Sequence, residues 1–243
     1  MGEKSFTAAR RIRWAVGFAL LLLALALFFV WSLMSGSVAL RAGEVLSAVL
    51  SGGGSDLAAD VIWKIRLPRL LAGMVLGGAL ALSGYLLQVF FHNPIAGPFV
   101  LGISSGAKLT VALALIFVLR QHRMASAAFL ILAAFAGAML SMAFVLLMAR
   151  RVRGMSMLVI SGMMIGYICS AITDFVVTFA SDADIVNLHN WSMGSFSGMS
   201  WDNVRVMTAV VAAAGVGSFL LAKPIGAFQM GEDYAQSVGV PLK

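Results

Sequence analysis

Two ionisable residues, Lys108 and Asp174, lie well inside long apolar runs of the sequence. Runs of about 20 apolar residues cross a lipid bilayer as helices, and a charged side chain at that depth is costly enough to be a functional candidate by default. The chemistry open to these two residues is proton transfer or contact with a substrate in transit. No chain of carboxylates accompanies them, so the sequence gives a proton relay no support.

The sequence offers no other group with the spacing that catalysis or metal binding requires. It has no HExxH motif, no P-loop and no GxGxxG that opens a helix after a strand. The single cysteine, Cys169, is expected to be a small buried hydrophobe. Three histidines are expected to be hydrated residues near the membrane boundaries: His92, His122 and His189. We therefore expect no catalytic residue, no metal site and no cofactor bound by this chain.

The composition predicts a polytopic membrane protein. Of the 243 residues, 61% are hydrophobic and 11% are charged, and the mean hydropathy is +0.98. Soluble domains carry about 25% charged residues. The net charge of +7 comes from Lys and Arg placed between the apolar runs, which is typical of membrane proteins and does not indicate nucleic-acid binding.

Six apolar runs have roughly the length of a membrane span, and helices are expected because backbone polar groups must pair internally in lipid. The first run is longer than the apolar core of a signal peptide, about 7–15 residues, so we expect an uncleaved helix. The expected spans are Trp14–Met34, Leu70–Phe91, Phe99–Leu119, Met124–Ala149, Met155–Ala180 and Val204–Ala222.

Clusters of basic residues predict a cytoplasmic N-terminus. Arg10–Arg13 precedes the first span and Arg150–Arg153 follows the fourth, so both clusters lie inside if the N-terminus does. Lys108 is then about ten residues and Asp174 about nineteen residues from the inner face, a difference in depth of roughly 13 Å. A direct pair between them is expected only if one helix is displaced.

Three more polar segments are expected to lie at the membrane surfaces. Ser35–Ile65, with its Gly52–Ser55 tip, predicts an outer loop. Asn187–Asn203 predicts a short helix at the outer interface, where Trp is enriched. Pro224–Lys243 predicts a short amphipathic helix between glycines on the inner side. The fold class is therefore all-α, with about six transmembrane helices, an outer interfacial helix and an inner helix.

Small residues and prolines predict where helices pack and break. Three GxxxG motifs, at Gly73–Gly77, Gly102–Gly106 and Gly162–Gly166, let backbones approach closely and predict a compact bundle. The Asn93–Pro98 segment breaks a helix twice, and is either a simple turn or a shaped inner loop at a partner interface. Arg66–Arg69 encloses Pro68, which predicts a helix start. The two arginines contact either lipid headgroups or an acidic partner.

In this order the motifs resemble the permease subunits of type II ABC importers for iron-siderophores, haem and cobalamin, the FecCD family. The resemblance covers most of the chain. It is carried by Arg66–Arg69, Gly77–Gly84, Gln88, Asn93–Pro98, Leu101–Ala107, Leu158–Ser170, Trp191–Gly198 and Gly231–Val240.

The resemblance implies partners and site residues. The partners are cytoplasmic ATPase subunits that carry ATP and Mg, an outer substrate-binding protein and a second permease subunit, in a bacterial inner membrane. The residues that dock the binding protein are Arg66 and Arg69. Those that couple to the ATPase are Gly231, Glu232, Asp233, Ala235, Ser237 and Gly239. Those of the translocation path or gate are Met163, Met164, Tyr167, Asp174, Trp191, Ser192, Gly194 and Ser195.

The function expected from the resemblance is ATP-driven import of a ferric siderophore or similar iron chelate by alternating access, with haem and cobalamin as further candidates. Residues 1–243 are expected to form one permease domain, with 224–243 as its coupling segment; the family continues with further spans beyond that segment. Lys108 and Asp174 depart from the family pattern, which has small, apolar or hydroxyl residues there. Two alternatives stay open: an ion-coupled carrier, although no inverted repeat is evident, and a truncated fragment that does not transport.

Overall fold

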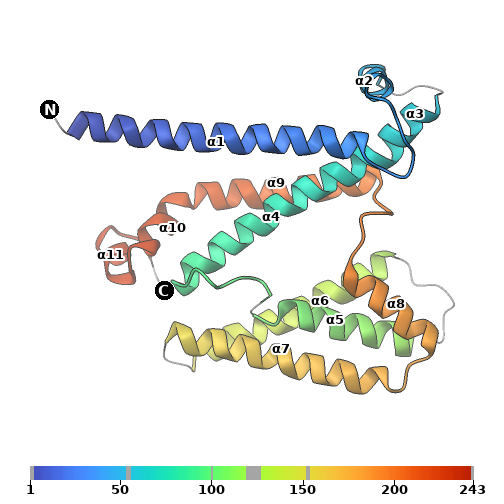
Figure 1. Ribbon diagram of the computed structural model, residues 1–243. Helices are drawn as coiled ribbons and strands as arrows, with labels where there is room; N and C mark the ends of the chain where they lie inside the picture. Colours follow the sequence, from blue (N-terminus) through green and yellow to red (C-terminus); the bar gives the residue numbers. More distant parts are fainter. Residues whose placement is uncertain (1–2, 53–55, 100, 119–126, 152–153, 242–243) are drawn as a thin grey trace. The chain divides into compact units, whose positions relative to one another are not determined.

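The computed structural model describes residues 3–52, 56–99, 101–118, 127–151 and 154–241, and the regular structure in these ranges is helical (Figure 1). Five of the described helices are long and apolar enough to cross a membrane: Arg10–Met34, Leu57–Phe91, Ala128–Ala149, Ser156–Val177 and Trp201–Leu220. The all-α membrane fold is thus confirmed. Some residues named in the sequence analysis lie outside the described ranges: Gly53–Ser55 of the expected loop tip, His122 and Arg153.

The chain forms two compact units, which are described separately. Unit 1 comprises Met1–Leu76 and Phe196–Val210, and unit 2 comprises Gly77–Ser195 and Val211–Lys243. Two helices, α4 (Leu67–Phe91) and α9 (Trp201–Leu220), belong partly to each unit.

Unit 1 is built on the long helix α1 (Glu3–Met34) and the short helices that follow it, α2 (Ala42–Leu50) and α3 (Leu57–Asp60). The expected outer loop therefore contains helical structure. Helix α2 begins where the backbone N–H of Arg41 donates to the Glu44 carboxylate over 2.8 Å. The core of the unit consists of Leu33, Val45, Ala48, Ala59, Ile62 and Leu67.

A π-helical segment, η1 (Val61–Arg66), joins α3 directly to α4, so the backbone is helical from Leu57 to Phe91. The expected helix start at Pro68 is therefore wrong. The N–H of Leu67 bonds to the carbonyl of Ile62, five residues back, and the wider turn lets the chain pass Pro68, which has no N–H to donate. Pro68 is fully buried at this junction.

In unit 2, α5 (Ile103–Leu113) packs against α6 (Ala127–Ala149) and α7 (Met155–Val177), and the three lie side by side in Figure 1. A second π-helical segment, η2 (Ala114–Val118), continues α5. The apolar helix described here, Ile103–Phe117, is shorter than the other spans. The expected start at Phe99 is wrong because Gly102 adopts a left-handed conformation, φ 70°, and the helix begins only after it.

Helix α8 (Asp182–Met193) replaces the interfacial helix expected over Asn187–Asn203. It begins early because Ser181 caps it: the Asp184 N–H donates to Ser181 Oγ over 3.3 Å. It ends at Gly194, whose φ of 71° is incompatible with continued helix. The unit also contains α10 (Ala222–Gln229) and α11 (Glu232–Ser237), which supply the expected short helix between glycines.

Candidate translocation and coupling sites

Glycines let the backbone of α5 touch those of its two neighbours. A Cβ added to Gly102 would lie 2.7 Å from the carbonyl oxygen of Gly162 and from the amide nitrogen of Gly166. On the α6 side, a Cβ on Gly106 would lie 2.8 Å from the carbonyl oxygen of Gly137. Two of the predicted GxxxG motifs therefore form one seam, as small residues do in membrane bundles.

Helices α5 and α7 run parallel in a fixed register. A Cβ on Gly162 would lie 3.0 Å from the Cα of Leu101, and the hydroxyl of Ser170 lies 3.5 Å from that of Ser105. The next helical turn brings Lys108 and Asp174 to the same level. The expected depth difference of roughly 13 Å, at 1.5 Å per residue, is therefore wrong: α5 starts beside the third turn of α7 rather than level with its first.

A pocket of about 310 Å³ lies along this α5–α7 pair. The polar side-chain groups of the described residues that line it are hydroxyls, and none of these residues is charged. Of the predicted path residues, Met163 and Tyr167 line it, whereas the exposed Met164 does not. The full lining is Phe99, Gly102, Ser105, Met163, Gly166, Tyr167 and Ser170. Size and lining suit part of a bulky ligand with a mixed apolar and hydrogen-bonding surface.

The predicted gate residues of α8 and beyond have different surroundings. Trp191 packs beside Leu188, which is buried against Val111, Ala112 and Leu115 of α5 and η2. Ser192 Oγ donates to the carbonyl of Leu188 over 2.7 Å. Gly194 ends the helix, and Ser195 is exposed after it. The short helix expected over Asn187–Asn203 is thus wrong beyond Met193, and Trp191 is the member of this group that anchors α8.

The two arginines that the sequence places together lie in different environments within unit 1. Arg66 is 7% exposed, and its guanidinium donates to the backbone carbonyls of Leu33, in the last turn of α1, and of Val38, after the helix ends. Arg69 is exposed, and its Nη2 donates to the carbonyl of Ser197 over 2.9 Å. Arg66 therefore closes the turn after α1, and Arg69 is the arginine that a partner can reach.

A tryptophan pair in unit 1 was not predicted. Trp201 Nε1 donates to the carbonyl of Trp63 over 2.7 Å, and Trp63 Nε1 donates to the carbonyl of Ala48 over 2.8 Å. These bonds connect α9, η1 and α2. The sequence signal was the amphipathic character of Trp, which needs a partner for its N–H when half-buried.

Helix α11 is a short, tightly closed element. It begins after Gly231, φ 118°, and ends at Ser237, two residues before Gly239, φ 84°. The Val240 N–H bonds to the carbonyl of Ala235 over 2.9 Å and the Gly239 N–H to that of Gln236, the paired bonds of a Schellman ending. Ala235 is fully buried, whereas Glu232 and Asp233 in the first turn and Ser237 in the last are exposed. The predicted coupling residues thus fall into two groups. Gly231, Ala235 and Gly239 form the frame of the helix, and Glu232 and Asp233 form an exposed acidic surface.

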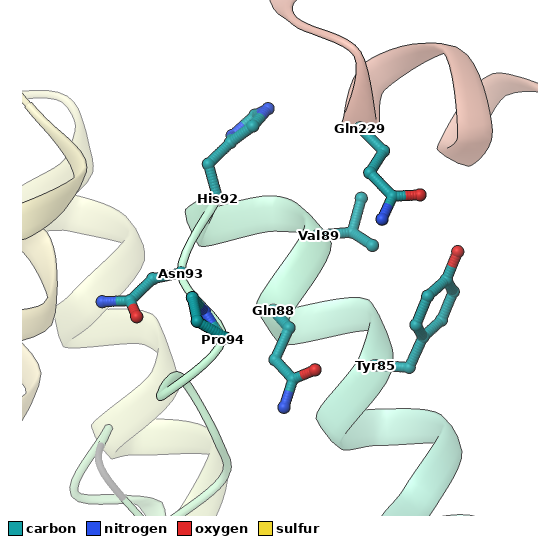
Figure 2. A pocket seen from close by; sticks show the side chains of 7 residues that line it. All are labelled: Tyr85, Gln88, Val89, His92, Asn93, Pro94 and Gln229. Carbon is teal, nitrogen blue, oxygen red and sulfur yellow. The ribbon is translucent and has the colours of Figure 1, made fainter.

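A pocket of about 340 Å³ lies beside this segment, where α4 ends (Figure 2). His92, in the left-handed region at φ 47°, places its Nε2 3.0 Å from the carbonyl oxygen of Phe228 in α10. Its ring centroid lies 4.9 Å from that of Phe228. The expected boundary histidine is therefore the link between the Asn93–Pro98 turn and α10. The pocket is lined by Tyr85, Gln88, Val89, His92, Asn93, Pro94 and Gln229.

Comparison with known proteins identifies the class of this molecule. The model of the FecCD transport family matches residues 22–243. The vitamin B12 import system permease proteins BtuC of Salmonella paratyphi A (strain ATCC 9150 / SARB42) and Salmonella newport (strain SL254) are each 35% identical to it over 233 residues, which cover 96% of this chain and 67% of theirs. The chain belongs to the FecCD transport family.

A solved structure gives the same assignment. A protein described as a metal-chelate type ABC transporter in an inward-facing conformation matches with a TM-score of 0.76 and 26% identity, over 94% of this chain and 68% of that one. The chain is accordingly a multi-pass permease subunit of a type II ABC importer. The family implies an ATPase, a binding protein and a paired permease as partners.

Proposed function

We propose that this subunit moves a bulky metal chelate inward through the bacterial inner membrane by alternating access. The observation that carries the proposal is the pocket on α5–α7, which combines Met163 and Tyr167 with serine hydroxyls and contains no charge. Such a lining binds a large ligand weakly, and weak binding suits a site that must release its substrate. A ferric siderophore is the substrate expected from the sequence. The B12 permeases among its relatives make a corrinoid the other chelate to test.

The ATPase contact is proposed at α11. Glu232 and Asp233 project from a helix that two glycines and a Schellman ending hold rigid. Movement of α11 is passed to α10, and from there to the end of α4 through the His92–Phe228 contact. ATP-driven closure of the ATPase would then favour one of two bundle states, and the difference in affinity between the states drives the change.

The contact with the binding protein is proposed at Arg69. The side chain is exposed and held by Ser197, so a cationic group has a fixed position at the surface of unit 1. Arg66 contributes indirectly, because its buried guanidinium holds the turn after α1. The proposal accordingly has docking outside, coupling inside and the N-terminus in the cytoplasm.

The test is reconstitution of the full chain with its ATPase, binding protein and partner permease in liposomes. We expect uptake of ⁵⁵Fe-siderophore or ⁵⁷Co-cyanocobalamin that requires ATP, and loss of both uptake and stimulated ATPase activity in Glu232→Ala/Asp233→Ala. The control is Asp202→Ala/Asp182→Ala, a pair of exposed acidic residues on other helices. Uptake that is driven by a proton gradient and is indifferent to ATP would contradict the proposal.

A further inference from the structure

Lys108 and Asp174 share one level and one face of the α5–α7 pair. On α7, Asp174 follows Met163, Tyr167 and Ser170 by eleven, seven and four residues, so it continues the stripe that lines the pocket. On α5, Lys108 lies three residues beyond Ser105, which lines the same pocket. Both charged side chains are exposed.

The opposite face of α5 is occupied by α6. Gly106 meets Gly137 and Ser141 there, and Thr110 Oγ1 donates to the carbonyl of Ala133 over 2.7 Å. On α7, Thr173 is 2% exposed, next to the exposed Asp174. The two charges therefore lie on the open face of the pair, away from the packed interior.

Their position along the helices is also defined. One turn before them lie Ser105 and Ser170, at the end of the uncharged pocket. One turn beyond them, Val111 and Val177 pack into the cluster that holds Leu188 and Trp191 of α8. A ligand that moves along this face between the pocket and α8 must pass Lys108 and Asp174.

Neither charge has a hydrogen-bond or ion-pair partner among the described residues, whose two ion pairs are Lys64–Asp60 and Arg205–Asp202. Charges in a membrane-spanning segment are costly unless they face a polar path or neutralise one another. Two opposite charges at one level on adjacent parallel helices, next to the pocket, are placed so that either condition can be met.

We propose that Lys108 and Asp174 determine the substrate specificity of the path, pairing with each other when it is empty and with the substrate as it passes. This inference rests on the proposed function. The ligand class that fits is a chelate whose periphery carries both kinds of group: acceptor or anionic groups for the Lys108 ammonium, and N–H or cationic groups for the Asp174 carboxylate. A chelate that carries only one kind of group leaves either Lys108 or Asp174 unpaired as it passes. The free-energy cost of that unpaired charge discriminates against the chelate.

The experiment measures ATP-dependent uptake of cationic, neutral and anionic ferric chelates and of cyanocobalamin by the reconstituted complex. In Lys108→Met we expect kcat/KM to fall about tenfold more for anionic than for cationic chelates, and in Asp174→Asn the reverse. The exchanged variant Lys108→Asp/Asp174→Lys keeps a pair but changes the order of preference. The matched control is Lys64→Met/Asp60→Asn, which removes an exposed ion pair of 2.8 Å on α3 and η1.

Equal losses for every chelate, or wild-type preference in the exchanged variant, would overturn the inference. If the unaltered complex transports none of the chelates, the proposed function fails, and a second readout still tests the pairing. This readout is a double-mutant cycle on the thermal midpoint of the purified chain. Coupled substitutions, with the double variant losing less than the sum of the single ones, support the pair, whereas additive losses overturn it.

Discussion

The indole N–H of Trp201 donates to the backbone carbonyl of Trp63 over 2.7 Å, and the two rings lie 6.0 Å apart. This contact joins the first turn of α9 to the π-helical segment η1 across a long stretch of sequence. Both rings pack against the core cluster of unit 1. The pair therefore fixes the end of unit 1 at which the exposed Arg69 lies.

Trp201→Phe should lower the free energy of unfolding by about 1 kcal/mol. The phenyl ring fills much of the volume of the indole, so the main loss is the hydrogen bond from the indole N–H to the carbonyl of Trp63. Thermal unfolding of the detergent-solubilised chain measures the change. Trp31→Phe is the control, since Trp31 is 65% exposed. Equal midpoints for Trp201→Phe and the unaltered chain would show that the indole bond contributes nothing.

Arg66→Lys should destabilise the chain by about 1–3 kcal/mol while keeping its charge, because a single ammonium cannot reproduce the forked contact with the carbonyls of Leu33 and Val38. Arg69→Lys should leave the thermal midpoint nearly unchanged and instead weaken binding-protein affinity. Thermal unfolding and a binding titration with the same two variants separate these roles. A stable Arg66→Lys with impaired docking would reverse the assignment.

Gly106→Ala should lower stability by about 1–3 kcal/mol through overpacking of the α5–α6 seam. The added Cβ would lie 1.9 Å from Ser141 Oγ and 2.8 Å from the carbonyl oxygen of Gly137. Adding Ser141→Ala should restore part of the loss, because the backbone contact remains. Gly217→Ala in α9 has no neighbour within 4 Å and should be neutral or stabilising.

Gly239→Ala should strain the end of α11 by about 1–2 kcal/mol, because φ is 84° there and a Cβ disfavours that region. The expected readout is weaker stimulation of the ATPase with little change in the global thermal midpoint, since α11 lies at the end of its unit. Gly226→Ala in α10 is the matched control, with no Cβ contact within 4 Å and no positive φ. Full stimulation in Gly239→Ala would contradict a coupling role for this frame.

The sequence was sufficient for the features that depend on local pattern. Apolar length predicted the long spans, and GxxxG spacing predicted close backbone approach, which the structure shows where Gly102 meets Gly162 and Gly166. The glycine-bounded helix at Glu232–Ser237 was also predictable from composition. The third motif, Gly73–Gly77, shows that spacing alone is insufficient: a Cβ there meets no atom within 4 Å in its own unit.

The features that were missed depend on register between segments far apart in sequence. The depth of Lys108 was counted as if its helix began level with α7, but α5 begins beside the third turn of α7, so Lys108 and Asp174 become level. The burial of Arg66 depends on carbonyls about thirty residues earlier, which no local pattern reveals. Local pattern therefore singles out individual residues, whereas their neighbours depend on the fold.

The π-helical segment Val61–Arg66 constrains insertions and deletions in this part of the chain. A π turn holds about one residue more than an α turn, so the segment turns the backbone about as far as an α-helix with one residue fewer, and removing one residue would restore ordinary α-helix with the flanking helices still in register. An added residue would instead rotate everything before it by about 100° relative to α4, and Ile62, which is 0% exposed, and Trp63 would leave the core and the contact with Trp201. The segment should consequently tolerate the loss of one residue far better than the gain of one.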